Sequence, residues 1–282
     1  MAAGMFLFAI VDTQAKILTD TLHPIQIVWT RQLGLLIGVL LILLFRGTSI
    51  LQTQHLALQI SRGFLAAGSA ILFVFAITYV PLADAVAITF VAPFMVTIMG
   101  ALILKEPVGI RRWIAVAIGF AGTLIVVRPG LGVIHPAALL IIVAAGLFAS
   151  RQILSRFLSS SDRTITTICY TALGSSLILT LPLPFIWQSP TTTTEFTLLV
   201  SIAILAALAE CLVIKSLEIA QAVALAPVHY SLMIWGTLYG YLIFNQLPDL
   251  WTWIGALIII ITGIYTIHRE RQADKRRLSE AS

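Results

Sequence analysis

Long runs of apolar residues alternate with short polar breaks along most of the chain. The stretch from Ala85 to Leu104 has 20 residues without a charge, and a helix of that length crosses about 30 Å of hydrocarbon. The breaks carry turn residues such as His23-Pro24 and Pro248-Asp249. The pattern therefore predicts ten membrane-crossing helices. They cover Ala3–Leu18, Ile25–Phe45, Ala57–Tyr79, Ala83–Leu104, Trp113–Val127, Pro136–Phe157, Ile165–Trp187, Phe196–Ile214, Ala222–Phe244 and Leu250–His268.

Composition supports an all-α membrane protein with no soluble domain. Of the 282 residues, 59% are hydrophobic and only 10% are charged, whereas a soluble protein carries roughly 25% charged residues. The cysteines, Cys169 and Cys211, both fall inside apolar runs. They therefore indicate neither a disulfide framework nor a metal site.

The distribution of basic residues predicts the orientation in the membrane. With the N-terminus in the cytoplasm, fourteen of the 17 Lys and Arg residues fall on the cytoplasmic side, including a basic tail over residues 269–282. Only Arg128 falls outside, and Lys16 and Arg31 lie within predicted helices. This is the positive-inside pattern, so both termini are expected in the cytoplasm. The formal charge of +5 then reflects topology and does not indicate a nucleic-acid partner.

The two halves of the chain repeat each other. At an offset of 140 residues, Phe8-Ala9 matches Phe148-Ala149 and Trp113-Ile114 matches Trp253-Ile254. Each half has five predicted helices, and because five is odd, the second half must be inserted upside down. The sequence thus predicts two inverted five-helix repeats (5+5), over residues 1–130 and 131–268. Inverted repeats are typical of secondary transporters, which bind substrate between the repeats near the midplane.

Several residues of the first half resemble a known repeat. Pro93 midway along a predicted helix, Glu106 at its end, and then Trp113, Gly119 and Gly122 resemble the EamA repeat of the drug/metabolite transporter superfamily. Within the superfamily, the chain is most similar to the YddG-type bacterial exporters of aromatic amino acids.

The second half keeps part of this pattern. It has Trp253, Gly255 and Gly263 but carries Gln246 in place of the glutamate. The resemblance implies a transporter of the bacterial inner membrane that takes a small-molecule substrate and needs no cofactor. It also implies a central cavity lined by the first, third, fourth, sixth, eighth and ninth predicted helices.

The fourth predicted helix carries a face suited to such a cavity. Thr89, Pro93 and Gly100 share that face at helical spacing, and the equivalent face of the ninth helix carries a similar set of small and polar groups. We expect the substrate to contact these faces and the aromatic side chains beside them. The predicted substrate-binding residues are Tyr79, Thr89, Phe90, Pro93, Gly100, His229, Tyr230, Met233, Gly236 and Gly240. Simpler alternatives are a packing kink at Pro93 and ordinary helix packing at the glycines.

Ionisable residues inside the predicted helices are the candidates for coupling, since burying them in a membrane is costly. Asp12 and Lys16 lie four residues apart and could pair on one helix face. Glu210 has no such partner and is a candidate proton carrier. A structural ion pair is the alternative for Asp12 and Lys16. Arg31 is expected to be an interfacial anchor, with binding of a substrate carboxylate as the alternative.

The predicted function is the export of amino acids, aromatic or otherwise bulky and neutral, by alternating access. The alternative is a multidrug or quaternary-amine exporter, in which Asp12 or Glu210 would face the cation. Phosphate-bearing substrates are disfavoured because they call for more basic residues in the membrane than Lys16 and Arg31. No HExxH, Ser/His/Asp or P-loop pattern is present, so we do not expect an enzyme. Proton coupling stays open, as does the choice between a monomer and a homodimer.

Overall fold

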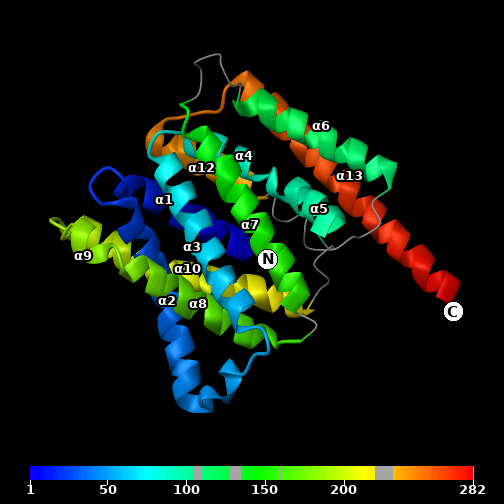
Figure 1. Cartoon of the computed structure of the whole chain (residues 1–282). Coiled ribbons are helices and arrows are strands. Elements are labelled where there is room, and N and C mark those ends of the chain that lie inside the picture. The colour runs from blue at the N-terminus through cyan, green and yellow to red at the C-terminus, as the bar shows by residue number, and fades with distance from the viewer. Residues whose placement is uncertain (104–108, 128–134, 159–160, 220–230, 282) are drawn as a thin grey trace.

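A computed structural model describes residues 1–103, 109–127, 135–158, 161–219 and 231–281, and within these ranges the chain is helical with no strand (Figure 1). The helices are α1 (Ala2–Leu18), α2 (Pro24–Arg46), the short 3₁₀ helix η1 (Thr48–Leu51), α3 (Leu56–Ile77), α4 (Leu82–Thr89), α5 (Ala92–Ile103), α6 (Ile110–Val127), α7 (Ala138–Leu158), α8 (Thr164–Thr180), α9 (Leu183–Ile186), α10 (Thr193–Ile219), α12 (Ser231–Phe244) and α13 (Leu250–Ala281).

The helices are those of a multi-pass membrane protein. Among the described residues, five segments are long and apolar enough to cross a bilayer, namely α2, α3, α4 with α5, α7 and the Thr193–Val213 part of α10. Large apolar side chains project from the molecule, for example Leu44, Phe45 and Phe185, which are 77%, 82% and 89% exposed. Such exposure over many helices is unfavourable in water and is expected where a surface faces lipid.

The fourth predicted helix, Ala83–Leu104, corresponds to one apolar segment of membrane length, Leu82–Ile103, but this segment is two helices and not one continuous helix. α4 ends at Thr89 and α5 begins at Ala92. Pro93 has no amide hydrogen and so cannot donate to the carbonyl of Thr89. The amides of Phe90 and Val91 bond instead to carbonyls three residues earlier, at 3.3 and 3.1 Å. This tight turn separates the two helices.

Two other helix ends differ from the prediction. The seventh predicted helix stops as α8 at Thr180, and Pro182 precedes the single turn of α9. The last predicted helix continues past His268, so that the backbone of the expected tail is helical to Ala281. The ninth predicted helix is described only from Ser231 onward, as α12.

Local sequence accounts for where α2 and α10 begin. Pro24 occupies the first turn of α2, and Nδ1 of His23 accepts a hydrogen bond from the amide of Ile25. At α10, Thr192 Oγ1 accepts from the amide of Glu195 at 3.2 Å, while Glu195 Oε2 accepts from the amide of Thr191 at 2.7 Å. These contacts satisfy amides that have no partner inside the helix.

Small residues set the closest helix contacts. α6 and α13 lie side by side (Figure 1), and a Cβ atom on Gly255 would stand 2.6 Å from the carbonyl oxygen of Gly122. On α2, a Cβ on Gly34 would stand only 2.0 Å from the carbonyl oxygen of Ala203 in α10. The glycines of the EamA-like pattern therefore permit close approach of α6 to α13.

The other helices enclose the ionisable residues. α1 packs against α10 and α12, α3 packs against α7 and α8, and α2 packs against both α8 and α10. The main apolar core joins side chains such as Val11, Ile77, Ile88 and Ile202, each fully buried. The charged side chains described next lie on α1, α2, α3, α7 and α10.

Candidate functional site

Asp12 and Lys16 do not pair with each other, which corrects the expected contact along one helix face. Asp12 Oδ1 instead forms an ion pair with Arg31 Nη1 of α2 at 2.9 Å. Lys16 Nζ donates to the carbonyl oxygen of Val80 at 2.8 Å and lies 3.4 Å from Gln246 Oε1. Arg31 is therefore a partner of Asp12, and Lys16 joins three chain segments.

Two arginines lie over phenylalanine rings at equivalent positions of the two halves. The Arg31 guanidinium carbon is 5.4 Å from the ring centre of Phe8 in α1. In α7, the guanidinium carbon of Arg151 is 4.9 Å from the ring centre of Phe148. Phe8 and Phe148 are 140 residues apart, the offset at which the halves match. Both contacts have cation–π geometry, in which the ring face attracts the cation.

Arg62 and Arg151, which the charge count assigned to the cytoplasmic side, lie within α3 and α7. Arg62 is in the second turn of α3, and Arg151 is about two turns before the end of α7. Arg62 Nε donates to Ser155 Oγ at 2.8 Å, and its Nη1 donates to the Thr167 carbonyl at 3.2 Å and to the Thr171 hydroxyl. Arg62 thus joins α3 to α7 and α8.

Arg151 is held differently. Its Nε is buried and has no hydrogen-bond partner. The side chain is surrounded by protein, yet the residue keeps some accessible surface. Arg151 lies within electrostatic range of Arg31 and of Glu210 in α10.

Charges of both signs therefore meet between the helices. We call Asp12, Arg31, Arg62, Arg151 and Glu210 the charged cluster. Arg62 and Arg151 lie within electrostatic range of each other and of Glu210, but among the described residues neither forms a direct ion pair with it. The cluster contains three guanidinium groups and two carboxylates, which leaves one excess positive charge. An excess charge inside a membrane is costly unless a counterion approaches it.

The predicted substrate-binding residues of α4 and α5 do not gather in one open face. Thr89 Oγ1 donates to the carbonyl of Val86 at 2.6 Å. Phe90 is buried in the main core, Gly100 is buried on α5, and Pro93 is exposed. Thr89 and Phe90 thus contribute to the turn and its packing, and substrate contact at these positions stays a prediction.

Only some of the substrate-binding residues predicted on the ninth helix lie in the part of the chain that the structure describes. His229 and Tyr230 lie outside the described residues. Met233, Gly236 and Gly240 are buried on α12, and α12 packs against α4. A Cβ on Gly236 would stand 3.2 Å from Val86 Cγ2 of α4. The two glycines allow α4 and α12 to approach closely.

Tyr79 lines a pocket, but one remote from the charged cluster. Its ring stacks on the His135 imidazole, with centroids 4.7 Å apart and planes 11° apart. The pocket measures about 440 Å³ and is lined by Phe75, Tyr79, His135, Pro136, Ala137 and Leu140. Its lining contains no arginine or carboxylate.

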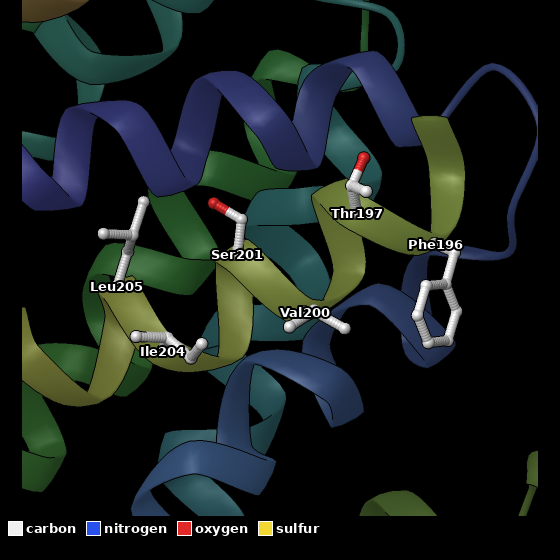
Figure 2. Close-up of a pocket in the computed structure, with 6 residues that line it drawn as sticks. All are labelled: Phe196, Thr197, Val200, Ser201, Ile204 and Leu205. Atoms are coloured by element: carbon white, nitrogen blue, oxygen red, sulfur yellow. The ribbon is translucent and has the colours of Figure 1, made fainter. Parts of the chain in front are cut away.

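A second pocket, of about 400 Å³, runs along α10 (Figure 2). It is lined by Phe196, Thr197, Val200, Ser201, Ile204 and Leu205. Ser201 points toward α1 (Figure 2), where its Oγ accepts a hydrogen bond of 2.9 Å from Gln14 Nε2. Phe196 and Ile204 are 61% and 54% exposed, and no lining residue is charged, so this groove suits a hydrocarbon chain better than a polar substrate.

Sequence reasoning placed Asp12 and Glu210 inside helices but missed the roles of Arg62 and Arg151. Both arginines fall within the predicted ranges Ala57–Tyr79 and Pro136–Phe157, but the charge count assigned them to the cytoplasmic side. One signal was present for Arg151, because it follows Phe148, the equivalent of Phe8, by three residues. Residues three apart on a helix lie on the same face. Among the described residues, no group of three or more His, Cys, Asp or Glu side chains could hold a metal ion.

Sequence comparison matches the EamA-like transporter family over residues 1–128 and again over 135–268. A riboflavin transporter of Vibrio cholerae is 31% identical over 230 residues, which is 80% of this chain and 76% of that protein. An S-adenosylmethionine uptake transporter of Rickettsia bellii is 26% identical over 98% of this chain and 96% of its own. A pseudopaline exporter of Pseudomonas aeruginosa is 26% identical, over 92% and 91%.

One solved structure, described only as "Crystal structure of protein", superposes with a TM-score of 0.60 at 15% identity. The match covers 96% of this chain and 98% of the other, and it supports the fold alone. The sequence matches go further, because the family covers both halves of the chain and the relatives named above are transporters and not enzymes. The protein belongs to the EamA-like transporter family of the drug/metabolite transporter superfamily.

Proposed function

We propose that this transporter exports bulky neutral amino acids, aromatic ones included, and related metabolites across the bacterial inner membrane by alternating access. The observation that carries the proposal is the charged cluster, in which guanidinium groups, carboxylates and phenylalanine rings meet inside the bilayer-crossing helices. A zwitterionic amino acid presents a carboxylate, an ammonium and, when aromatic, an apolar ring. Each of these groups has a complementary partner in the cluster.

The proposal includes ten membrane spans in two inverted repeats, residues 1–130 and 131–268, followed by a cytoplasmic tail. The family matches each half separately. Helix contacts also come in equivalent pairs: α1 with α10 corresponds to α7 with α3, and α1 with α12 corresponds to α7 with α5. Rocking of one repeat against the other would expose the cluster to each side in turn.

Contacts between connections support an alternating topology with both termini in the cytoplasm. Thr53 and Asp162, both assigned to the cytoplasmic side, are hydrogen-bonded. On the other side, Gln26 Nε2 donates to the carbonyl of Gln188 at 2.8 Å, and the amide of Gln188 donates to Gln26 Oε1 at 2.9 Å. The excess of basic residues on the first side makes it the cytoplasmic one.

Two other substrate classes remain to be compared with amino acids. The 31% identity to a riboflavin transporter favours a larger aromatic metabolite as the second candidate. A quaternary-amine exporter is less favoured, because the cluster has an excess positive charge that repels a permanent cation. Direction follows the gradients, and the relatives include both an uptake transporter and an exporter.

Solute counterflow in proteoliposomes of the purified protein tests the proposal. Liposomes are loaded with unlabelled phenylalanine, leucine, riboflavin, S-adenosylmethionine or a quaternary amine, and labelled phenylalanine is added outside. We expect transient accumulation of label with internal phenylalanine and less with the quaternary amine. Accumulation with riboflavin or the amine only would replace the amino-acid assignment.

The same liposomes test coupling to protons. Glu210 is the proposed proton carrier, and an imposed pH gradient should change phenylalanine flux if Glu210 exchanges a proton during transport. The Glu210→Gln variant should then show the same phenylalanine flux with and without the gradient. A wild-type flux that ignores the gradient would identify a facilitator instead.

A further inference from the structure

Arg151 differs from the other two arginines of the charged cluster in having no polar side chain committed to it. Arg31 Nη1 bonds to Asp12 at 2.9 Å, and Arg62 donates to Ser155, Thr167 and Thr171. The guanidinium of Arg151 lies over the Phe148 ring, and its buried Nε has no hydrogen-bond partner. A buried donor without a partner carries a desolvation cost that an arriving acceptor removes.

The neighbouring charges also favour an anion beside Arg151. Arg62 and Arg151 lie within electrostatic range of each other, and like charges at short range in a low-dielectric medium repel strongly. Ser155, one turn after Arg151 on α7, accepts from Arg62 and so holds the two guanidinium groups in the same region. A carboxylate bound there would reduce the repulsion and neutralise the excess charge.

Glu210 supplies the complementary charge. Its field reaches both Arg62 and Arg151, yet among the described residues it forms no direct ion pair with either. Glu210 is partly accessible and lies on α10, a different helix from the two arginines. Arg151 and Glu210 thus form no ion pair among the described residues and lie within electrostatic range of each other. Together they present opposite charges to one zwitterion.

We propose that Arg151 binds the carboxylate of the transported α-amino acid and that Glu210 binds its ammonium group. The guanidinium offers two parallel N–H donors to a carboxylate, and the Phe148 ring supports the guanidinium from one face. Arg62 is a positioning residue, held by serine and threonine, that adds positive charge to the carboxylate end. This assignment rests on the proposed function and names the groups of the substrate that the charged cluster recognises.

The test measures the binding of ligands to the purified protein in detergent by calorimetry. Four ligands share one phenyl ring: L-phenylalanine, phenethylamine without the carboxylate, 3-phenylpropionate without the ammonium, and the neutral-headed alcohol 3-phenylpropanol. For wild type, phenylalanine should bind most tightly. In Arg151→Gln its affinity should fall roughly 10- to 100-fold, because a hydrogen bond to a charged group is worth about 1.5–3 kcal/mol, while the affinity for phenethylamine stays unchanged.

Glu210→Gln should have the opposite selectivity. It should lower the affinity for phenylalanine and phenethylamine but leave the affinity for 3-phenylpropionate unchanged. Arg46→Gln is the matched control, since Arg46 is exposed at the end of α2 and should leave all affinities as in wild type. Arg151→Lys keeps the charge but loses the two-pronged geometry, so it should bind phenylalanine with intermediate affinity. If Arg151→Gln does not fold, the phenylalanine affinity of Arg151→Lys tests the role of Arg151 in its place.

Two results would overturn the assignment. In the first, the Arg151→Gln protein binds phenylalanine like wild type; in the second, its affinity for all four ligands falls equally. Failure of the proposed function gives a different result. If wild type binds no amino acid but binds 3-phenylpropionate in an Arg151-dependent way, the carboxylate site stands and the amino-acid assignment fails. Absence of binding to every carboxylate would refute the site itself.

Discussion

At the scale of single residues, the Asp12–Arg31 pair explains how charge is tolerated between α1 and α2. The side chain of Asp12 is 9% exposed and that of Arg31 is 21% exposed. Removing one partner would leave the other as an uncompensated charge away from water. The ring of Phe8 adds a second favourable contact for Arg31 but cannot replace the carboxylate.

A double-mutant cycle tests this pair. Asp12→Asn should lower the free energy of unfolding by roughly 3–5 kcal/mol, toward the lower end because Arg31 keeps some exposure. Adding Arg31→Gln should restore part of the loss, since no unpaired charge remains. Unfolding in detergent micelles, followed by tryptophan fluorescence, measures all four proteins. The exposed Arg46→Gln on the same helix is the control, and strictly additive losses would contradict the pairing.

At the scale of helices, two glycines of α2 that look alike in sequence differ in their surroundings. Gly34 and Gly38 form a GxxxG pattern of the kind that permits close helix approach. A Cβ atom on Gly34 would clash with the carbonyl of Ala203 in α10, whereas a Cβ on Gly38 would meet nothing within 4 Å. Only Gly34 is therefore required for contact between α2 and α10.

These glycines provide a matched pair of variants. Gly34→Ala should lower the unfolding temperature markedly or prevent folding, because α2 and α10 must move apart by more than an ångström. Gly38→Ala should be neutral or stabilising by up to about 1 kcal/mol, since alanine favours helix over glycine. Thermal unfolding of the two purified proteins measures the difference. Equal effects of the two substitutions would show that α2 and α10 do not pack as described.

At the scale of the whole molecule, a polar network ties the α2–α3 connection to the α7–α8 connection. Asp162 accepts hydrogen bonds from the Thr53 hydroxyl and from Gln59 Nε2, the latter at 2.7 Å. The hydrogen bond from Thr53 is the main cause that lowers the pKa of Asp162 from its usual value of 3.8, and the hydrogen bond from Gln59 lowers it further. The carboxylate of Asp162 thus helps to join the two halves of the chain at this end.

The lowered pKa predicts a pH dependence of stability. Because the unfolded chain takes up the proton more readily, Asp162 stabilises the fold above pH 3.8, and this contribution disappears as pH falls through the lower folded pKa. The difference in unfolding temperature between wild type and Asp162→Asn should therefore be largest near neutral pH and shrink below about pH 4. Thr53→Val should reduce the pH-dependent part. A difference that does not change with pH would refute the network.

The sequence predicted the helices well, because apolar runs of membrane length are explicit in it. It also predicted that Pro93 disturbs its helix, although not that α4 and α5 are separate. The partners of the charged side chains could not be predicted in the same way. Whether Asp12 meets Lys16 or Arg31 depends on how α1 packs against α2. The position of Arg62 and Arg151 relative to the bilayer depends on helix ends, which hydropathy places only within several residues.

The proposed substrate face of α4, α5 and α12 illustrates the same limit. Periodicity groups Thr89, Pro93 and Gly100 on one face only if the helix is continuous, and the turn before Pro93 ends that continuity. Glycines such as Gly236 are equally compatible with an open cavity and with a close helix contact. Only the position of Val86 on the facing helix distinguishes between the two.

Counterflow of labelled phenylalanine into proteoliposomes loaded with unlabelled phenylalanine tests the central claim most directly. A carrier that exposes one site alternately to each side must couple the two fluxes. We therefore predict a transient accumulation of label above equilibrium that requires internal phenylalanine and is lost in Arg151→Gln but kept in Arg46→Gln. Simple equilibration of label, whatever the liposomes contain, would contradict alternating access with an amino-acid substrate.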